Sequence, residues 1–177
     1  ATPSEKLAES LSKLKNLQNE KGIAVIKSDD LSRTHKERLL DNGFIHEVIK
    51  GWYIAVNPDD QNGDTTSWFA SFWDFVSKYI TAKFGSDWCL SPEQSLLLHS
   101  GNFIVPKQLL IRSPKASSNL IELMNNTSVF DSKVDIPPAG ERIILDGINL
   151  YSLPSALVAV KNDFFKRNRT DALICLG

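Results

Sequence analysis

A short segment near the start of the chain carries side chains that could contact duplex DNA. The candidate residues are Arg33, Thr34, Lys36 and Lys50. In a helix that reads DNA, side chains of the first turn reach base edges, while nearby basic groups hold phosphates. Three of these residues lie at the start of a predicted helix, and Lys50 lies in a predicted turn. The pattern indicates a DNA-reading surface.

Acidic side chains interrupt the same segment and weaken this interpretation. Glu37, Asp41 and Glu47 lie among the basic residues. Because few basic groups lie on that face, about three phosphate contacts is a generous count. Counterion release then gives a log–log salt slope of roughly −3. A module that binds a protein partner or regulates another domain fits these residues about as well. Both alternatives stay open at this point.

Residue types that could support catalysis or bind a metal are scattered through the chain. His35, His46 and His99 show no metal-ligand spacing, and His99 falls where a helix C-terminus is expected. Cys89 and Cys175 are isolated, which predicts reduced, buried thiols. The sequence holds no glycine-rich phosphate loop and no Gly-x-Ser-x-Gly elbow. We therefore expect no enzyme activity, no cofactor and no metal site.

Aromatic residues between positions 68 and 75 could stack on bases or fill a core. The cluster consists of Trp68, Phe69, Phe72, Trp73 and Phe75. Surfaces that stack on bases combine aromatic with basic side chains, but no arginine or lysine lies within this cluster. The helical spacing favours core packing, with Trp73 beside the main stripe.

The DNA-binding candidates require a helix followed by two strands. Ser32 can cap a helix that ends near Gly43, where a positive φ suits glycine. The next residues favour strands over 44–48 and 52–56, joined by a tight turn at Lys50-Gly51. An amphipathic helix with leucines at 7, 11, 14 and 17 precedes them and ends at Lys21-Gly22. These elements predict a winged helix-turn-helix domain over residues 1–57, in which residues 28–31 form either a turn or a short second helix.

The remaining chain predicts a second domain over residues 64–177, after a linker rich in turn-forming residues at 57–64. Helices are expected at about 65–84, from Ser91-Pro92 to Gly101, at 154–161 and from about 170. Strands are predicted at 103–105, 108–112, 120–124, 127–130, 142–145 and 148–151, with a hairpin turn at Asp146-Gly147. The expected fold class is α+β: an N-terminal winged helix-turn-helix followed by an α+β domain with a mostly antiparallel sheet.

Composition limits the kinds of partner and the cellular location that fit this chain. The 177 residues carry a net charge of −1, so no overall positive field draws the protein to DNA or to anionic lipid. An apolar share of 42% supports an ordinary core, and no apolar run approaches the ~20 residues that span a bilayer. We expect a soluble cytoplasmic chain with no membrane partner. The apolar run over residues 172–177 suggests a piece of a longer protein.

Two longer patterns resemble known bacterial families. Residues 32–40, 43–45 and 48–54 resemble the N-terminal winged helix of AbiEi-type antitoxin regulators. A wider pattern resembles the N-terminal region of a group of Fic-family proteins. It is carried by four segments: Trp68–Phe75, Asp87–Leu96, Gln108–Lys115 and Leu153–Leu157.

The Fic resemblance implies a neighbouring catalytic domain that transfers a nucleotide monophosphate, usually AMP, to a protein hydroxyl. The Fic motif, His-Pro-Phe-x-x-Gly-Asn-Gly-Arg, is absent from this sequence, so no catalytic residue is carried over. The first interpretation is a non-catalytic regulatory or interaction module of a Fic-like AMP-transferase, with a C-terminal Fic domain or another protein as its partner. The alternative is an AbiEi-like antitoxin, a transcriptional regulator of a toxin–antitoxin pair that binds duplex DNA through its winged helix.

Overall fold

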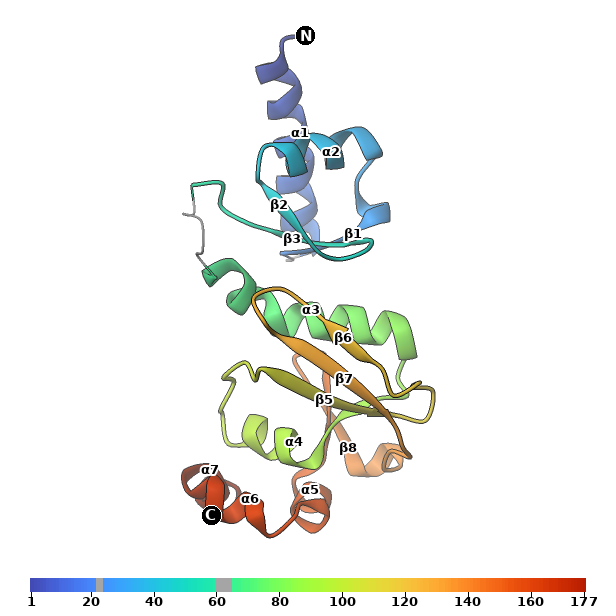
Figure 1. Cartoon of the computed structure of the whole chain (residues 1–177), viewed down its shortest axis with the longest axis vertical. Coiled ribbons are helices and arrows are strands. Elements are labelled where there is room, and N and C mark those ends of the chain that lie inside the picture. Colours follow the sequence, from blue (N-terminus) through green and yellow to red (C-terminus); the bar gives the residue numbers. More distant parts are fainter. Residues whose placement is uncertain (22–23, 60–64) are drawn as a thin grey trace. The chain divides into compact units, whose positions relative to one another are not determined.

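The chain forms two compact units in the computed structural model, which describes residues 1–21, 24–59 and 65–177 (Figure 1). The first unit is Ala1–Lys78 and the second is Tyr79–Gly177, so the division falls inside helix α3 (Thr66–Phe84). Helices combine with mostly antiparallel sheets, which confirms the α+β class. Most of the predicted linker, residues 60–64, lies outside the described residues. The domain boundary expected there stays a prediction.

The first unit alternates helices with a three-stranded sheet. Its elements before α3 are α1 (Pro3–Lys21), β1 (Val25–Lys27), the single-turn helix η1 (Ser28–Asp30), α2 (Arg33–Asp41), β2 (Ile45–Ile49) and β3 (Trp52–Ala55). β3 lies between β1 and β2, and both pairings are antiparallel. The predicted helix after Ser32 and the hairpin around Lys50-Gly51 are confirmed. The predicted helix end at Gly22 lies outside the described residues.

Local sequence explains the turns of this unit. Gly43 follows the end of α2 with φ +74°, and Gly51 lies in the hairpin turn with φ +85°. A residue with a Cβ atom adopts such a positive φ only with strain. The apolar face of α1 packs on α2 and the sheet. The buried core residues are Leu14, Ile26, Leu31, Leu39, Ile45 and Tyr53.

The aromatic cluster of α3 is part of a core, as predicted. Trp68, Phe72 and Phe75 are buried, and the rings of Phe72 and Phe75 lie 5.6 and 5.4 Å from that of Trp68 in edge-to-face contacts. Phe75 also meets Trp52 of β3, with 6.1 Å between ring centroids. Phe69, by contrast, is 39% exposed.

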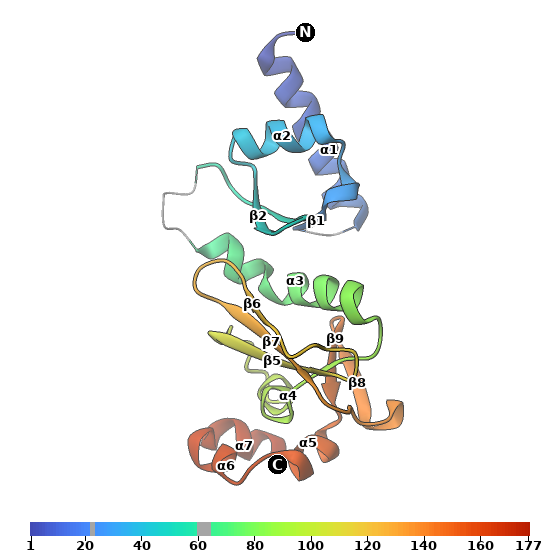
Figure 2. The same ribbon diagram turned by 45° about the vertical axis from the view of Figure 1, so that its right-hand side comes forward.

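The second unit is built on a four-stranded sheet with the order β4-β5-β7-β6. Figure 2 shows α4 on one side of this sheet and α5, α6 and α7 beyond α4. A separate antiparallel hairpin, β8–β9, completes the unit. Its elements after α3 are β4 (Cys89–Leu90), α4 (Pro92–His99), β5 (Gln108–Ser113), β6 (Leu120–Glu122), β7 (Ser128–Lys133), η2 (Ala139–Glu141), β8 (Arg142–Leu145), β9 (Ile148–Tyr151), α5 (Leu153–Ala159), α6 (Asp163–Arg167) and α7 (Arg169–Leu176).

The strand predicted at Phe103–Val105 is wrong. The segment carries neither helix nor strand, and Ile104 is 78% exposed. The backbone N–H of Ile104 donates to the side-chain oxygen of Asn102 at 3.1 Å, so a local turn takes the place of a strand partner. The sequence also did not predict β4, α6 or the parallel pairing of β5 with β7.

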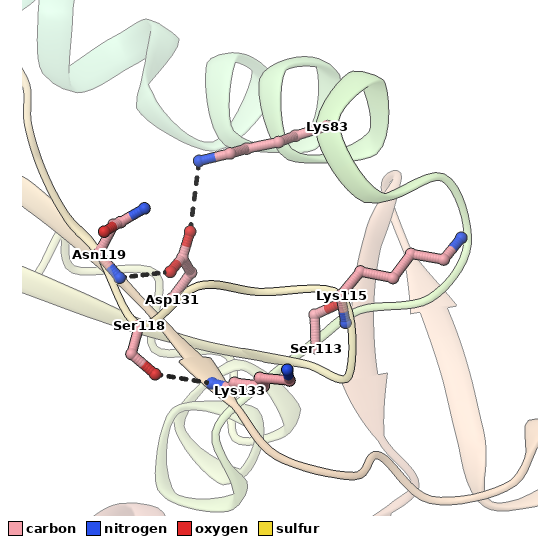
Figure 3. Close-up of polar contacts among 7 residues, drawn as sticks. All are labelled: Lys83, Ser113, Lys115, Ser118, Asn119, Asp131 and Lys133. Atoms are coloured by element: carbon pink, nitrogen blue, oxygen red, sulfur yellow. Dashed lines mark hydrogen bonds and ion pairs between the residues drawn. The ribbon is translucent and has the colours of Figure 1, made fainter.

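A buried carboxylate anchors the loop before β6 to β7 (Figure 3). Asp131 of β7 is fully buried, and its Oδ1 accepts a hydrogen bond from the backbone N–H of Asn119 at 2.7 Å. Its Oδ2 lies 3.3 Å from the ammonium of Lys83, on the last turn of α3. The hydroxyl of Ser118 accepts from the backbone N–H of Lys133 at 3.2 Å. Asp131 is thus paired with a charge and with a backbone donor, which indicates a structural role.

Candidate nucleic-acid interface

Helix α2 begins directly after its cap residue Ser32, and its first two residues, Arg33 and Thr34, are exposed. The Ser32 hydroxyl accepts from the backbone N–H of His35 at 3.3 Å, which satisfies one of the free donors at the helix start. Arg33, Thr34 and Glu37 are exposed on the side away from buried Leu39. The predicted base-reading positions Arg33 and Thr34 are therefore accessible.

Polar contacts fix α2 against α1. Ser10 is fully buried in α1, and its hydroxyl lies 2.8 Å from Nδ1 of His35. The guanidinium of Arg38 donates to the Lys6 carbonyl at 3.3 Å and to the Ser10 hydroxyl at 3.4 Å. These bonds bind His35 and Arg38 to the scaffold, so neither side chain belongs to the exposed face of α2.

The sequence suggested that Lys36 points outward with Arg33 and Thr34. In the structure it points inward instead. It is half-buried, and its ammonium donates to the Ser28 hydroxyl at 2.6 Å and lies 5.8 Å from the ring centroid of Tyr53. The backbone N–H of Ser28 in turn donates to the Gly51 carbonyl at 2.9 Å. Lys36 therefore links α2 to the turn of the β2–β3 hairpin.

The hairpin turn gathers basic side chains near Ser28. Lys50 is exposed at the turn, next to Gly51. Lys27, at the end of β1, is also exposed, and its ammonium lies 5.1 Å from the ring centroid of Trp52. The sequence analysis missed Lys27, although its place directly after the apolar pair Val25 and Ile26 was a usable signal. Lys27 and Lys50 thus flank the hairpin turn that Lys36 supports from within.

Acidic partners reduce the positive charge of this surface. Glu37 Oε1 accepts from Arg33 Nε at 2.7 Å, and both side chains are exposed. Its hydrogen bond and then its charge raise the pKa of Arg33 above the ordinary value. Burial, followed by a hydrogen bond and the charge of Glu47, raises the pKa of Tyr53 on β3. An approaching phosphate must compete with Glu37 for Arg33.

The other candidates for chemistry serve the packing of the second unit. Nε2 of His99 donates to the Tyr151 carbonyl at 2.8 Å, since a carbonyl can only accept. Cys89 and Cys175 are buried free thiols, and the Cys175 thiol donates to the Leu96 carbonyl at 3.3 Å. Burial raises the pKa of Cys175, and the charge of Asp171 raises it further. These thiols match the predicted reduced, buried cysteines.

Cys89 is expected to resist alkylation in the native protein. Burial raises the pKa of its thiol to about 12, despite opposing charges of Arg142 and Arg112, so about one thiol in 10⁴ is ionised near pH 8. Mass spectrometry after iodoacetamide treatment should find Cys89 unlabelled without denaturant and labelled with it. Labelling of Cys89 in the folded chain at the rate of a small free thiol would contradict this environment.

Within the described ranges, no three histidine, cysteine or carboxylate side chains gather to hold a metal ion. Over the same residues, the helices are too short or too polar to cross a membrane. Comparisons with protein-family models, with curated proteins and with solved structures each found no match to this chain. The resemblance to AbiEi and Fic proteins therefore depends on the sequence patterns given above.

Proposed function

We propose that this chain is a non-catalytic regulator whose first unit is a winged helix-turn-helix that binds duplex DNA. The observation that best supports this proposal is the order of elements in the first unit. A helix, a strand, a short helix, a capped helix and a two-strand hairpin follow one another, and β3 lies between β1 and β2. In this proposal η1 takes the place of the second helix and α2 is the recognition helix. The hairpin turn at Lys50-Gly51 is the wing.

The accessible side chains suit separate roles at such a surface. Arg33 and Thr34 lie in the first turn of α2, from which a recognition helix reaches base edges in the major groove. Lys50 and Lys27 flank the wing turn, where basic groups hold phosphates. Lys36 supports the wing through Ser28 and serves to position it.

Acidic side chains favour a second candidate, a non-catalytic interaction module beside a Fic domain. The exposed pair of Arg33 and Glu37 and the nearby Asp41 and Glu47 suit a protein partner with mixed charge better than a polyphosphate. Under this candidate the partner is a C-terminal Fic domain or another protein. No AMP transfer is expected from this chain under either proposal, because the sequence lacks the Fic motif.

Selection from a randomised duplex DNA library should separate the two candidates. The DNA proposal expects enrichment of a defined sequence, with loss of affinity of about tenfold or more for Arg33→Ala and Thr34→Ala at the preferred base pairs. Lys15→Ala removes an exposed lysine from α1 and serves as a matched control that keeps binding. Enrichment of no sequence by the folded chain would support the interaction module and contradict DNA recognition.

A further inference from the structure

The outer edge of strand β8 is open in the second unit. Among the described strands, β8 (Arg142–Leu145) pairs with β9 alone. The other edge of β9 meets α4, because the Tyr151 N–H donates to the Ser95 hydroxyl at 3.1 Å and the Tyr151 carbonyl accepts from His99 at 2.8 Å. β8 is therefore the edge strand of this hairpin, and an edge strand is a place where a further strand can pair.

The register of the hairpin determines which backbone groups of β8 face the open edge. The Ser152 N–H donates to the Glu141 carbonyl at 2.8 Å, which marks Glu141 as a position bonded across the hairpin. Bonded and non-bonded pairs alternate along an antiparallel ladder, so Arg142 and Ile144 point their backbone groups outward. The Arg142 N–H already donates to the Ala139 carbonyl. The Arg142 carbonyl and both backbone groups of Ile144 thus face the edge.

The side chains along this edge are aliphatic and accessible to water. Ile144 is 74% exposed, Ile143 is 39% exposed and Leu145 is half-buried. A cavity of about 460 Å³ opens beside them, lined by Ser86, Ala139, Arg142, Ile143, Ile144 and Asn149. Proteins that keep an edge strand unpaired usually place charged residues or proline along it. The aliphatic run of β8 lacks that protection and indicates a strand that pairs with another chain.

A second copy of β8 matches this edge in one antiparallel register, which is centred on Ile144. In that register Ile144 lies opposite Ile144 of the second copy, and Ile143 lies opposite Leu145. Arg142 lies opposite Asp146, the exposed residue that follows β8, so opposite charges flank the aliphatic pairs on both sides. A shift by two residues would place Ile144 opposite Arg142 or Asp146 and remove these matches.

The backbone groups agree with the same register. The two copies of Ile144 would each donate an N–H to the carbonyl of the other, as in a bonded antiparallel pair. The Arg142 carbonyl would accept from the Asp146 N–H of the second copy, and the Arg142 N–H is not needed. The Arg142 guanidinium donates to the Ser86 carbonyl at 2.9 Å and carries further N–H donors for a carboxylate.

We propose that the chain forms a homodimer in which two β8 strands pair at this edge and join both hairpins into one antiparallel sheet. The order of strands across the dimer is β9-β8-β8-β9. The same residues contribute from both copies, as a two-fold dimer requires, and the charge match of Arg142 with Asp146 is self-complementary. Two short strands make a small interface, so we expect a dissociation constant of about 10⁻⁵–10⁻³ M.

Sedimentation equilibrium of the full chain from about 10 µM to about 1 mM tests the dimer without DNA, so the result is independent of the DNA-binding proposal. Ile144→Lys would place two ammonium groups opposite each other and should weaken dimerisation about tenfold or more. Val158→Lys, the same change at an 88% exposed position of α5, should leave dimerisation unchanged. A chain that is monomeric at about 1 mM, or an Ile144→Lys variant that dimerises as well as the unaltered chain, would overturn the proposal.

Single cysteine substitutions test the register. Residue 144 would lie opposite itself with about 5.5 Å between Cα atoms, within disulfide range, whereas residue 145 would lie about 7–8 Å from its copy. The native Cys89 and Cys175 are buried. Under mild oxidation we expect Ile144→Cys to form a covalent dimer about tenfold or more faster than Leu145→Cys, and faster than Val158→Cys, which reports random collisions. Cross-linking of Ile144→Cys no faster than of either control would contradict the pairing.

Discussion

Replacement of Phe75 by alanine is expected to destabilise the protein by about 3–5 kcal/mol. Phe75 is fully buried and its ring meets Trp52 and Trp68 edge to face, so the substitution removes two aromatic contacts and leaves a cavity. The free energy of unfolding can be measured in urea, with tryptophan fluorescence and circular dichroism as independent probes.

Phe69→Ala is the matched control on the same helix. Phe69 is one of the aromatic residues of α3 but is 39% exposed, so its replacement should cost much less than that of Phe75. Equal losses of unfolding free energy for the two variants would show that burial of the ring does not decide how far the substitution destabilises the protein. A Phe75→Ala loss below about 1 kcal/mol would contradict the core assignment of the aromatic cluster.

Asp131→Ala is expected to cost about 2–4 kcal/mol, because it removes a buried carboxylate that accepts from one backbone donor and pairs with one lysine. The Asn119 N–H would lose its acceptor, and the Lys83 ammonium would lose its counter-charge. Lys83 remains partly exposed and can turn to water, so most of the loss should come from the Asn119 N–H, which loses its acceptor.

Asp131→Asn separates these two contributions. Its amide oxygen can still accept from Asn119, so the variant should retain part of the stability that alanine loses. Asp135→Ala removes an exposed carboxylate just beyond the same strand and should change the unfolding free energy by less than about 0.5 kcal/mol. Asp131→Ala with as little effect as Asp135→Ala would contradict the anchoring role seen in Figure 3.

Local sequence signals predicted the elements that carry the candidate DNA surface. The Ser32 cap, the positive φ of Gly43 and the turn at Lys50-Gly51 each act over a few residues, and all three appear in the structure. The cap at Ser91, whose hydroxyl accepts from the Gln94 N–H at 3.3 Å, was equally readable. Such signals depend on backbone geometry within one turn of the chain.

Features that depend on distant residues escaped prediction. Strand β4 has only two residues and exists because it pairs with Arg112 and Ile111 of β5. Lys36 faces inward because Ser28, a partner eight residues earlier, takes its ammonium. The open edge of β8 depends on which strands pair in space, so no single stretch of sequence contains it. Tertiary contacts override local pattern at these places.

The salt dependence of duplex DNA binding tests the central proposal most directly. Titration of a fluorescent duplex over a range of salt concentrations should give a log–log slope of roughly −3 for the unaltered chain. Lys50→Ala and Arg33→Ala should each weaken binding. Lys50→Ala removes a phosphate contact and should also reduce the slope by about 0.9. Lys15→Ala, the control on α1, should change neither quantity. Tight binding that neither Lys50→Ala nor Arg33→Ala weakens would place the DNA surface elsewhere and contradict the assignment of α2 and the β2–β3 hairpin.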